Sequence, residues 1–159
     1  KKMMLILAIL LPMLALPVTA DNITVTADVP PYVSAVFNYN TVNFGTVQPG
    51  STDVPAPGQE YGIYNVTLSA NVNVNVIAYR TDWSPFEGLT LKFGDTTTLT
   101  IAGTPDLKPM VTLGTAPQIV SYYPVVYSVT DYHGYWLTVP ATQVAARYST
   151  TVTITYQPA

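Results

Sequence analysis

The chain has 159 residues, of which 48% are hydrophobic and only 9% charged, and its six basic and nine acidic side chains give a net charge of −3. We expect no nucleic-acid partner, because binding phosphates requires clustered Lys and Arg. Cysteine is absent, so a secreted form would be stabilised by burial and hydrogen bonds without disulfides. A surface with so few ions tends to associate, which predicts exposed faces that meet other molecules.

Residues 1–20 have the pattern of a secretory signal peptide. Two lysines precede an apolar run, and Val18 and Ala20 occupy the small-residue positions of a cleavage site. The run is interrupted by prolines and is shorter than a transmembrane helix requires. We expect cleavage before Asp21 and a secreted, extracellular protein, whose net charge falls from −3 to −5 when the two lysines are removed. The alternative is a type IV pilin, in which the hydrophobic N-terminal helix is retained.

Residues 21–29, DNITVTADV, alternate polar and apolar side chains as a β-strand with one apolar face does. The apolar positions are Ile23, Val25, Ala27 and Val29. Pro30 and Pro31 follow as a stiff, extended hinge that cannot donate to a ladder. A strand at the start of the mature chain either completes its own sandwich or inserts into the next subunit by β-augmentation. Insertion is a heterologous contact, which propagates as a filament unless it closes a ring.

Residues 32–159 are expected to form one all-β domain, because period-2 alternation recurs and no helical period is sustained. The expected strands, separated by Pro- and Gly-containing turns, are 32–39, 41–47, 61–69, 72–79, 88–94, 96–103, 122–129, 135–139 and 148–156. Their number and spacing favour a single immunoglobulin-like, jelly-roll-type β-sandwich preceded by the signal peptide.

Two of these strands have a clearly defined core-facing side. It consists of Val72, Val74, Val76 and Ala78 in the first, and of Tyr148, Thr150, Val152, Ile154 and Tyr156 in the second. The opposite side of the second strand is rich in Thr and Ser, which is typical of a solvated, β-branched face.

The sequence contains no catalytic constellation and no cofactor motif. His133 is the only histidine, and DYHG at 131–134 predicts a turn with a solvated or locally bonded imidazole. The acidic residues fall in or beside expected turns or strand ends, except Asp28 on the outward face of the first strand. Asp82 and Glu87 flank WSPF and could offer oxygen atoms to calcium, but their spacing supports no site. We expect no enzyme, cofactor, metal or small-molecule substrate.

Aromatic residues are dense between Tyr122 and Trp136, where five tyrosines occur. Packing in the core or between subunits is their expected use, and stacking on carbohydrate is the alternative. Two N-x-[S/T] sequons make Asn22 and Asn65 candidate glycosylation sites.

Two segments, VNFGTVQPGS at 42–51 and GYWLTVPATQVAARYSTTVTITY at 134–156, resemble the β-sandwich subunits of archaeal bundling pili and their bacterial biofilm-matrix relatives of the TasA type. In those families a signal peptide is removed and the N-terminal strand is donated to the next subunit. The resemblance implies the same for residues 21–29. The expected function is therefore a structural subunit of an extracellular pilus or biofilm filament, with itself as partner and neighbouring filaments as further partners in bundles. The alternative is a monomeric secreted β-sandwich that serves at the cell surface or binds carbohydrate.

Overall fold

The computed structural model describes Thr24 and residues 26–159. The predicted signal peptide, Asn22, Ile23 and Val25 lie outside the described residues. The described strands are β1 (Val33–Phe37), β2 (Val54–Pro55), β3 (Asn65–Ala70), β4 (Val74–Arg80), β5 (Thr90–Thr96), β6 (Val111–Thr112), β7 (Gln118–Tyr123), β8 (Val126–Thr138) and β9 (Val152–Pro158). A 3-10 turn, η1 (Gln59–Tyr61), lies between β2 and β3. Within this part of the chain, no helix has the length and apolar character needed to cross a membrane.

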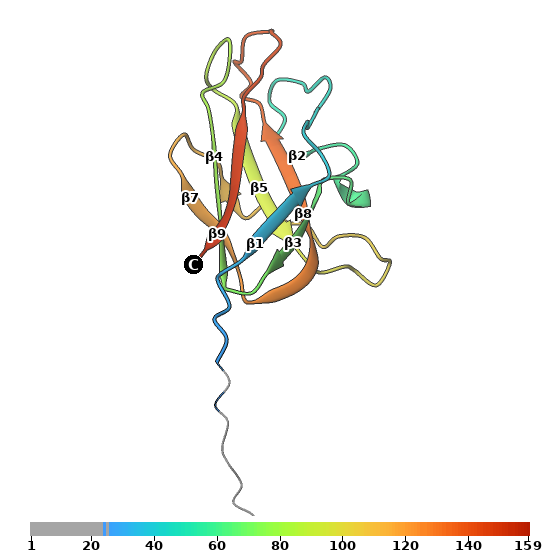
Figure 1. Ribbon diagram of the computed structural model, residues 1–159. Coiled ribbons are helices and arrows are strands. Elements are labelled where there is room, and N and C mark those ends of the chain that lie inside the picture. Colours follow the sequence, from blue (N-terminus) through green and yellow to red (C-terminus); the bar gives the residue numbers. More distant parts are fainter. Residues whose placement is uncertain (1–23, 25) are drawn as a thin grey trace, which may run out of the picture.

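The strands form two antiparallel sheets that face each other (Figure 1). The first sheet has the order β1-β3-β8-β5-β6, and β2 also pairs with β8. The second sheet has the order β7-β4-β9, so in the described residues three strands face six. This arrangement confirms the expected all-β class, and it leaves part of the first sheet's inner face without a strand opposite.

The core lies between the sheets and follows the period-2 pattern of the strands. Val74, Val76 and Ala78 of β4 are fully buried, as their alternation predicted. Val152 and Ile154 of β9 pack against the same hydrophobic cluster, which confirms the predicted core-facing side of the last strand. Alternate burial on both sheets is what a two-layer β fold requires.

A turn was predicted at residues 131–134, but these residues run through the middle of β8. Gly134 pairs with Gly94 of β5, and the Trp136 ring lies against both positions. A Cβ at Gly94 would also meet the carbonyl oxygen of Lys108. Glycine is present here because the chain and an aromatic ring approach the backbone closely. The turn prediction was wrong because a close-approach glycine and a turn glycine look alike in sequence.

Gly94→Ala is therefore expected to lower the free energy of unfolding by roughly 1–3 kcal/mol, because an added methyl group must displace backbone. The measurement is urea denaturation followed by tryptophan fluorescence. Gly114→Ala is the matched control, because a Cβ there meets nothing within 4 Å. Equal midpoints for the two variants would contradict the close approach at Gly94.

Two further expected strands are absent. After β5 ends at Thr96 the chain reverses, and the Thr100 N–H donates to the Thr104 carbonyl at 2.7 Å. Ile101 in this loop is fully exposed, so the alternation at 96–103 does not mark a buried face. Residues 41–47 form no ladder, although Phe44 among them packs against the core. Their alternation reflects contact with the core without a neighbouring strand to pair with.

The aromatic residues between 122 and 136 divide between the core and the surface. Tyr135 and Trp136 are buried, whereas Tyr122 and Tyr127 are exposed. Packing in the core is confirmed for the first two. Tyr122 and Tyr127 lie at the surface, where contact with another subunit or with carbohydrate stays a prediction.

Candidate functional site: an apolar groove beside β9

The N-terminal segment leaves the sandwich at one pole, which we call the tail pole. Here the Asn71 N–H donates to the Tyr32 carbonyl at 3.1 Å, and Asn71 Nδ2 donates to the Pro30 carbonyl at 2.9 Å. The Ala159 N–H donates to the Asn73 carbonyl at 2.9 Å, so the C-terminus lies at the same pole. Contacts with Asn71 thus fix the point at which the chain enters the domain.

Ahead of this point, the described residues belong to no strand. Thr24 and residues 26–31 are all exposed, and Val29 has an exposed fraction of 78%. Figure 1 shows the segment running away from both sheets. Ala27, Val29 and the hinge prolines Pro30 and Pro31 are therefore not packed into their own protomer.

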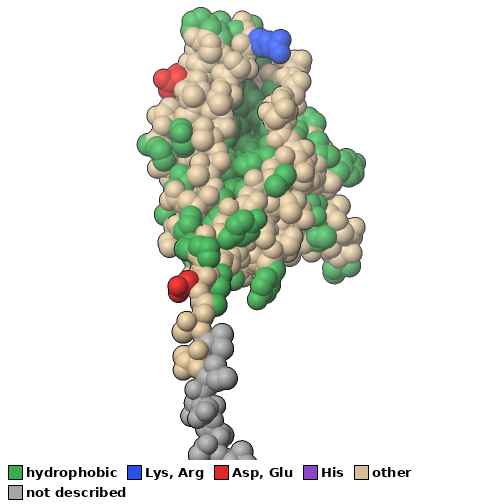
Figure 2. All heavy atoms as spheres, in the orientation of Figure 1, with side chains coloured by type: hydrophobic (Ala, Val, Ile, Leu, Met, Phe, Trp, Pro, Cys, Tyr) green, Lys and Arg blue, Asp and Glu red, His purple; other side chains and the backbone are tan. Residues whose placement is uncertain are grey.

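A groove with a volume of about 1050 Å³ opens toward the opposite pole. We call this end the groove pole; its loops are residues 81–89 and 140–151 (Figure 1). The floor of the groove contains Leu89, Leu91, Leu137 and Val139. Figure 2 shows hydrophobic side chains lining a hollow in this part of the surface. An apolar channel that reaches the core of a sandwich fits an extended chain with apolar side chains.

The two walls of the groove differ in structure. One wall is β9 with the residues that precede it, and the other is the segment 39–49, which contributes Val42, Phe44 and Val47. Because this segment forms no ladder, β9 is the edge strand of its sheet in the described residues. The groove is thus the place where a fourth strand of the β7-β4-β9 sheet would lie.

Within the described part of the chain, no strand pairs with the edge of β9 that lines this groove. The Thr151 carbonyl accepts a hydrogen bond from the Thr81 N–H, and the Ala159 N–H donates to the Asn73 carbonyl. The backbone N–H and C=O groups of the odd-numbered residues of β9 therefore point toward β4. By the alternation of an antiparallel ladder, the N–H and C=O groups of Val152, Ile154 and Tyr156 face away from β4. Such an edge is a template for another strand.

Trp83 is a lining residue of the groove with an unusual property. Its side chain is 8% exposed, and its Nε1 is the buried side-chain polar atom without a hydrogen-bond partner in the described part of the chain. A buried donor without an acceptor costs about 1–3 kcal/mol.

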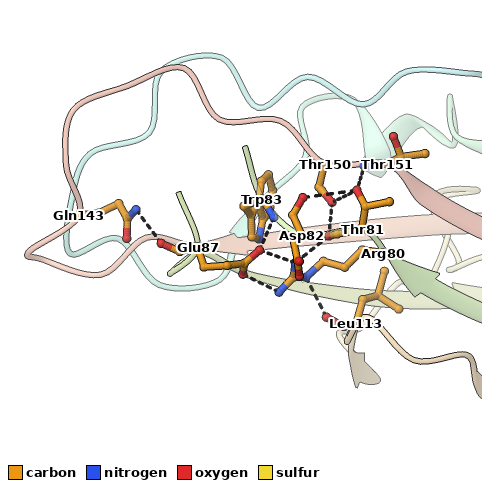
Figure 3. Close-up of polar contacts among 9 residues, drawn as sticks. All are labelled: Arg80, Thr81, Asp82, Trp83, Glu87, Leu113, Gln143, Thr150 and Thr151. Atoms are coloured by element: carbon orange, nitrogen blue, oxygen red, sulfur yellow. Dashed lines mark hydrogen bonds and ion pairs between the residues drawn. The ribbon is translucent and has the colours of Figure 1, made fainter. Parts of the chain in front are cut away.

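The backbone around Trp83 is held firmly in place (Figure 3). Ser84 and Ser149 exchange two backbone hydrogen bonds, of 2.9 and 3.0 Å. The Arg80 guanidinium lies 5.8 Å from the centroid of the Trp83 ring. The backbone N–H of Trp83 donates to Glu87 Oε1. These contacts fix the position of the indole relative to β9.

Glu87 takes part in these contacts through an ion pair with Arg80. Arg80 Nη2 lies 3.2 Å from Glu87 Oε2 (Figure 3). Burial raises the pKa of the Glu87 carboxyl. Hydrogen bonds from Arg80 and from the backbone N–H of Trp83 lower it by more, so the pKa lies below its usual value. Among the described residues no cluster of three potential metal ligands occurs.

The groove is closed toward the tail pole by a contact between the two sheets. The rings of Phe37 in β1 and Tyr156 in β9 lie 6.0 Å apart, centroid to centroid. Beside these rings, His133 Nε2 lies 2.8 Å from the Tyr156 hydroxyl, and His133 Nδ1 lies 2.5 Å from the Tyr39 hydroxyl. This His133 bridge joins β9 to the chain after β1 and limits the depth of the groove.

The His133 bridge is part of a buried polar network that the sequence did not reveal. Asp131 and His133 are both 0% exposed. The predictions of a solvated imidazole at His133 and of a turn position for Asp131 were therefore wrong. Asp131 accepts hydrogen bonds from the hydroxyls of Tyr123 at 2.8 Å and Tyr156 at 2.5 Å. Asp95, also expected in a turn, is buried at the end of β5.

Burial raises the pKa of Asp95 to about 6, and the nearby Asp131 adds to the effect. The folded state therefore holds this proton more tightly than the unfolded state, whose aspartate titrates near pH 3.8. The stability that Asp95 contributes is present in full below pH 3.8 and is lost as the pH rises through about 6.

We expect the free energy of unfolding of wild type, relative to Asp95→Asn, to fall by roughly 2–3 kcal/mol between pH 4 and pH 7. Urea denaturation of both proteins across this range measures the difference. Asp106→Asn, at an exposed aspartate, serves as the control and should leave the wild-type pH profile unchanged. A constant difference between wild type and Asp95→Asn would contradict the raised pKa.

Asn65, a candidate glycosylation site, lies at the start of β3. Its Nδ2 donates to the Gly62 carbonyl at 2.7 Å, and its Oδ1 accepts from Asn38 Nδ2 at 2.5 Å. The amide that would carry a glycan is thus engaged in the fold. Glycosylation here stays a prediction.

The sequence identified the apolar side of β9 but missed the groove, Trp83 and the acidic network. Whether the edge of a strand is free depends on the pairing order of the sheets, which alternation does not encode. The fold and this groove define an all-β protein of two antiparallel sheets with an open edge. No family model, no curated protein and no solved structure matches the chain.

Proposed function

We propose that the protein is a structural subunit of an extracellular filament, in which residues 21–29 of one copy fill the groove beside β9 of the next. The observation that carries this proposal is the pairing of a groove with an apolar floor and a described N-terminal segment that is exposed and belongs to no strand. The expected absence of catalytic activity belongs to the same proposal, as does an immunoglobulin-like, jelly-roll-type class for the sandwich.

The positions of donor and acceptor support a polymer over a closed dimer. The N-terminal segment leaves at the tail pole (Figure 1), and loops of the groove pole line the groove at the other end. Two different surfaces at opposite ends make a heterologous contact that repeats along a line. Pro30 and Pro31 would act as the extended hinge between one subunit and the next.

The energetics favour a stable joint. Ile23, Val25 and Val29 would contribute about 1.5–3 kcal/mol each on burial, and main-chain hydrogen bonds to β9 would add about 1 kcal/mol each. Ordering the segment and losing the freedom of two separate molecules offset part of this sum. The remainder suits a filament that must hold together without disulfides.

Electron cryomicroscopy of the secreted protein tests this function. The expected result is a filament in which density for residues 21–29 of one subunit lies beside β9 of its neighbour. A monomer on light scattering, with saturable binding of a polysaccharide in the groove, would instead favour a carbohydrate-binding protein. N-terminal sequencing that begins at Asp21 supports strand donation, whereas a retained leader supports a pilin with a helical core.

A further inference from the structure

We infer that the donated strand lies antiparallel to β9 and that the His133 bridge limits how deeply it is inserted. This inference rests on the proposed function and adds two properties to it. The first is the direction of the incoming strand. The second is the depth at which the strand stops.

The direction follows from the course of β9. Val152 pairs with Arg80, beside the loop at the groove pole, and Pro158 pairs with Val74, beside Asn73 at the tail pole. β9 therefore runs from the groove pole to the tail pole. Its direction is fixed relative to both ends of the molecule.

The donated segment runs the other way in a head-to-tail stack. It leaves its own domain at Tyr32 on the tail pole, and its residue numbers fall with distance from the domain (Figure 1). A neighbour stacked above the groove pole would insert this segment with its lowest numbers deepest. From N- to C-terminus, the strand then points toward the groove pole, opposite to β9.

The backbone of β9 accommodates such a partner. The N–H and C=O groups of Val152 and Ile154 face the groove as hydrogen-bonded positions, so Thr153 and Thr155 occupy the non-hydrogen-bonded positions opposite the incoming strand. The incoming strand also meets a stop, because the His133 bridge and the Phe37–Tyr156 ring contact close the far end. Direction and depth together define a register.

Disulfide trapping in filaments of the full secreted chain tests the direction, and the absence of native cysteine makes the readout clean. The donor positions are Thr24, Thr26 and Asp28, and the acceptor positions are Thr151, Thr153 and Thr155. Each donor cysteine is combined with each acceptor cysteine, since outward-facing, non-hydrogen-bonded pairs bring Cβ atoms within reach of a disulfide. Cross-linked dimers are quantified on non-reducing gels.

The expected result is that the best acceptor position moves to lower numbers as the donor position moves to higher numbers. If both numbers rise together, the strand is parallel to β9, and the inference is wrong while strand donation stands. If no pair cross-links between subunits, strand donation itself is wrong, and the inference fails with it.

Discussion

Ile23→Asp combined with Val25→Asp is expected to abolish filaments while leaving a folded subunit. In the proposed joint, both side chains enter an apolar groove, and burying a carboxylate without a partner costs several kcal/mol. A loss of about 4 kcal/mol would raise the threshold concentration roughly a thousandfold. The substitutions precede β1, so circular dichroism of the subunit should match that of wild type. Electron microscopy and light scattering measure assembly.

Thr24→Asp combined with Thr26→Asp is the matched control. It adds the same charge to the same segment but on the side that alternation assigns to solvent. Filaments should persist in this variant. If both pairs of substitutions abolished filaments, general charge repulsion would explain the result, and if neither did, residues 21–29 would not be the inserted strand.

Asp131→Ala is expected to lower the free energy of unfolding by about 3–5 kcal/mol, which is large for one substitution. Asp131 is fully buried and accepts hydrogen bonds from Tyr123 and Tyr156. Its removal takes one acceptor from each of two part-buried hydroxyl groups, which keep only Asp95 and His133 as partners, and each lost hydrogen bond costs about 1–3 kcal/mol. Urea denaturation provides the measurement. Asp131→Asn retains one acceptor oxygen and should lose less stability.

Asp106→Ala provides the surface comparison. Asp106 lies 3.4 Å from Lys108, and both side chains are substantially exposed. The expected change is within about 0.5 kcal/mol, because exposed ion pairs contribute little. A similar loss for Asp131→Ala and Asp106→Ala would mean that the buried network does not support the fold.

The sequence predicted well those strands whose two faces differ in environment. Val74, Val76 and Ala78 are fully buried and the residues between them only partly buried, because one face of β4 meets the core. The same contrast identified β9. The prediction failed at 41–47, where alternation persists without a ladder, and at Gly134, where glycine admits the Trp136 ring. In both places tertiary packing decided the outcome and local pattern did not.

The groove and the buried network could not have been predicted in the same way. The groove exists because three strands face six, and that count depends on which strands pair across long intervals of sequence. Asp95 and Asp131 come from different strands and meet only through the β5–β8 pairing and Tyr123. In sequence, each is an aspartate beside Gly or Tyr, which is typical of turns.

The placement of the free segment and the groove at opposite poles has a consequence for any chain of such subunits. Its two extremities are chemically unlike. At one extremity the last molecule displays an unfilled hydrophobic channel, which requires a cap or a further arriving molecule to shield it from water. At the other, the N-terminal strand of the last molecule has no acceptor, so it could attach the assembly to a surface that presents an unpaired strand edge. In the proposed filament, insertion of a new strand and attachment by the free strand would therefore occur at different ends.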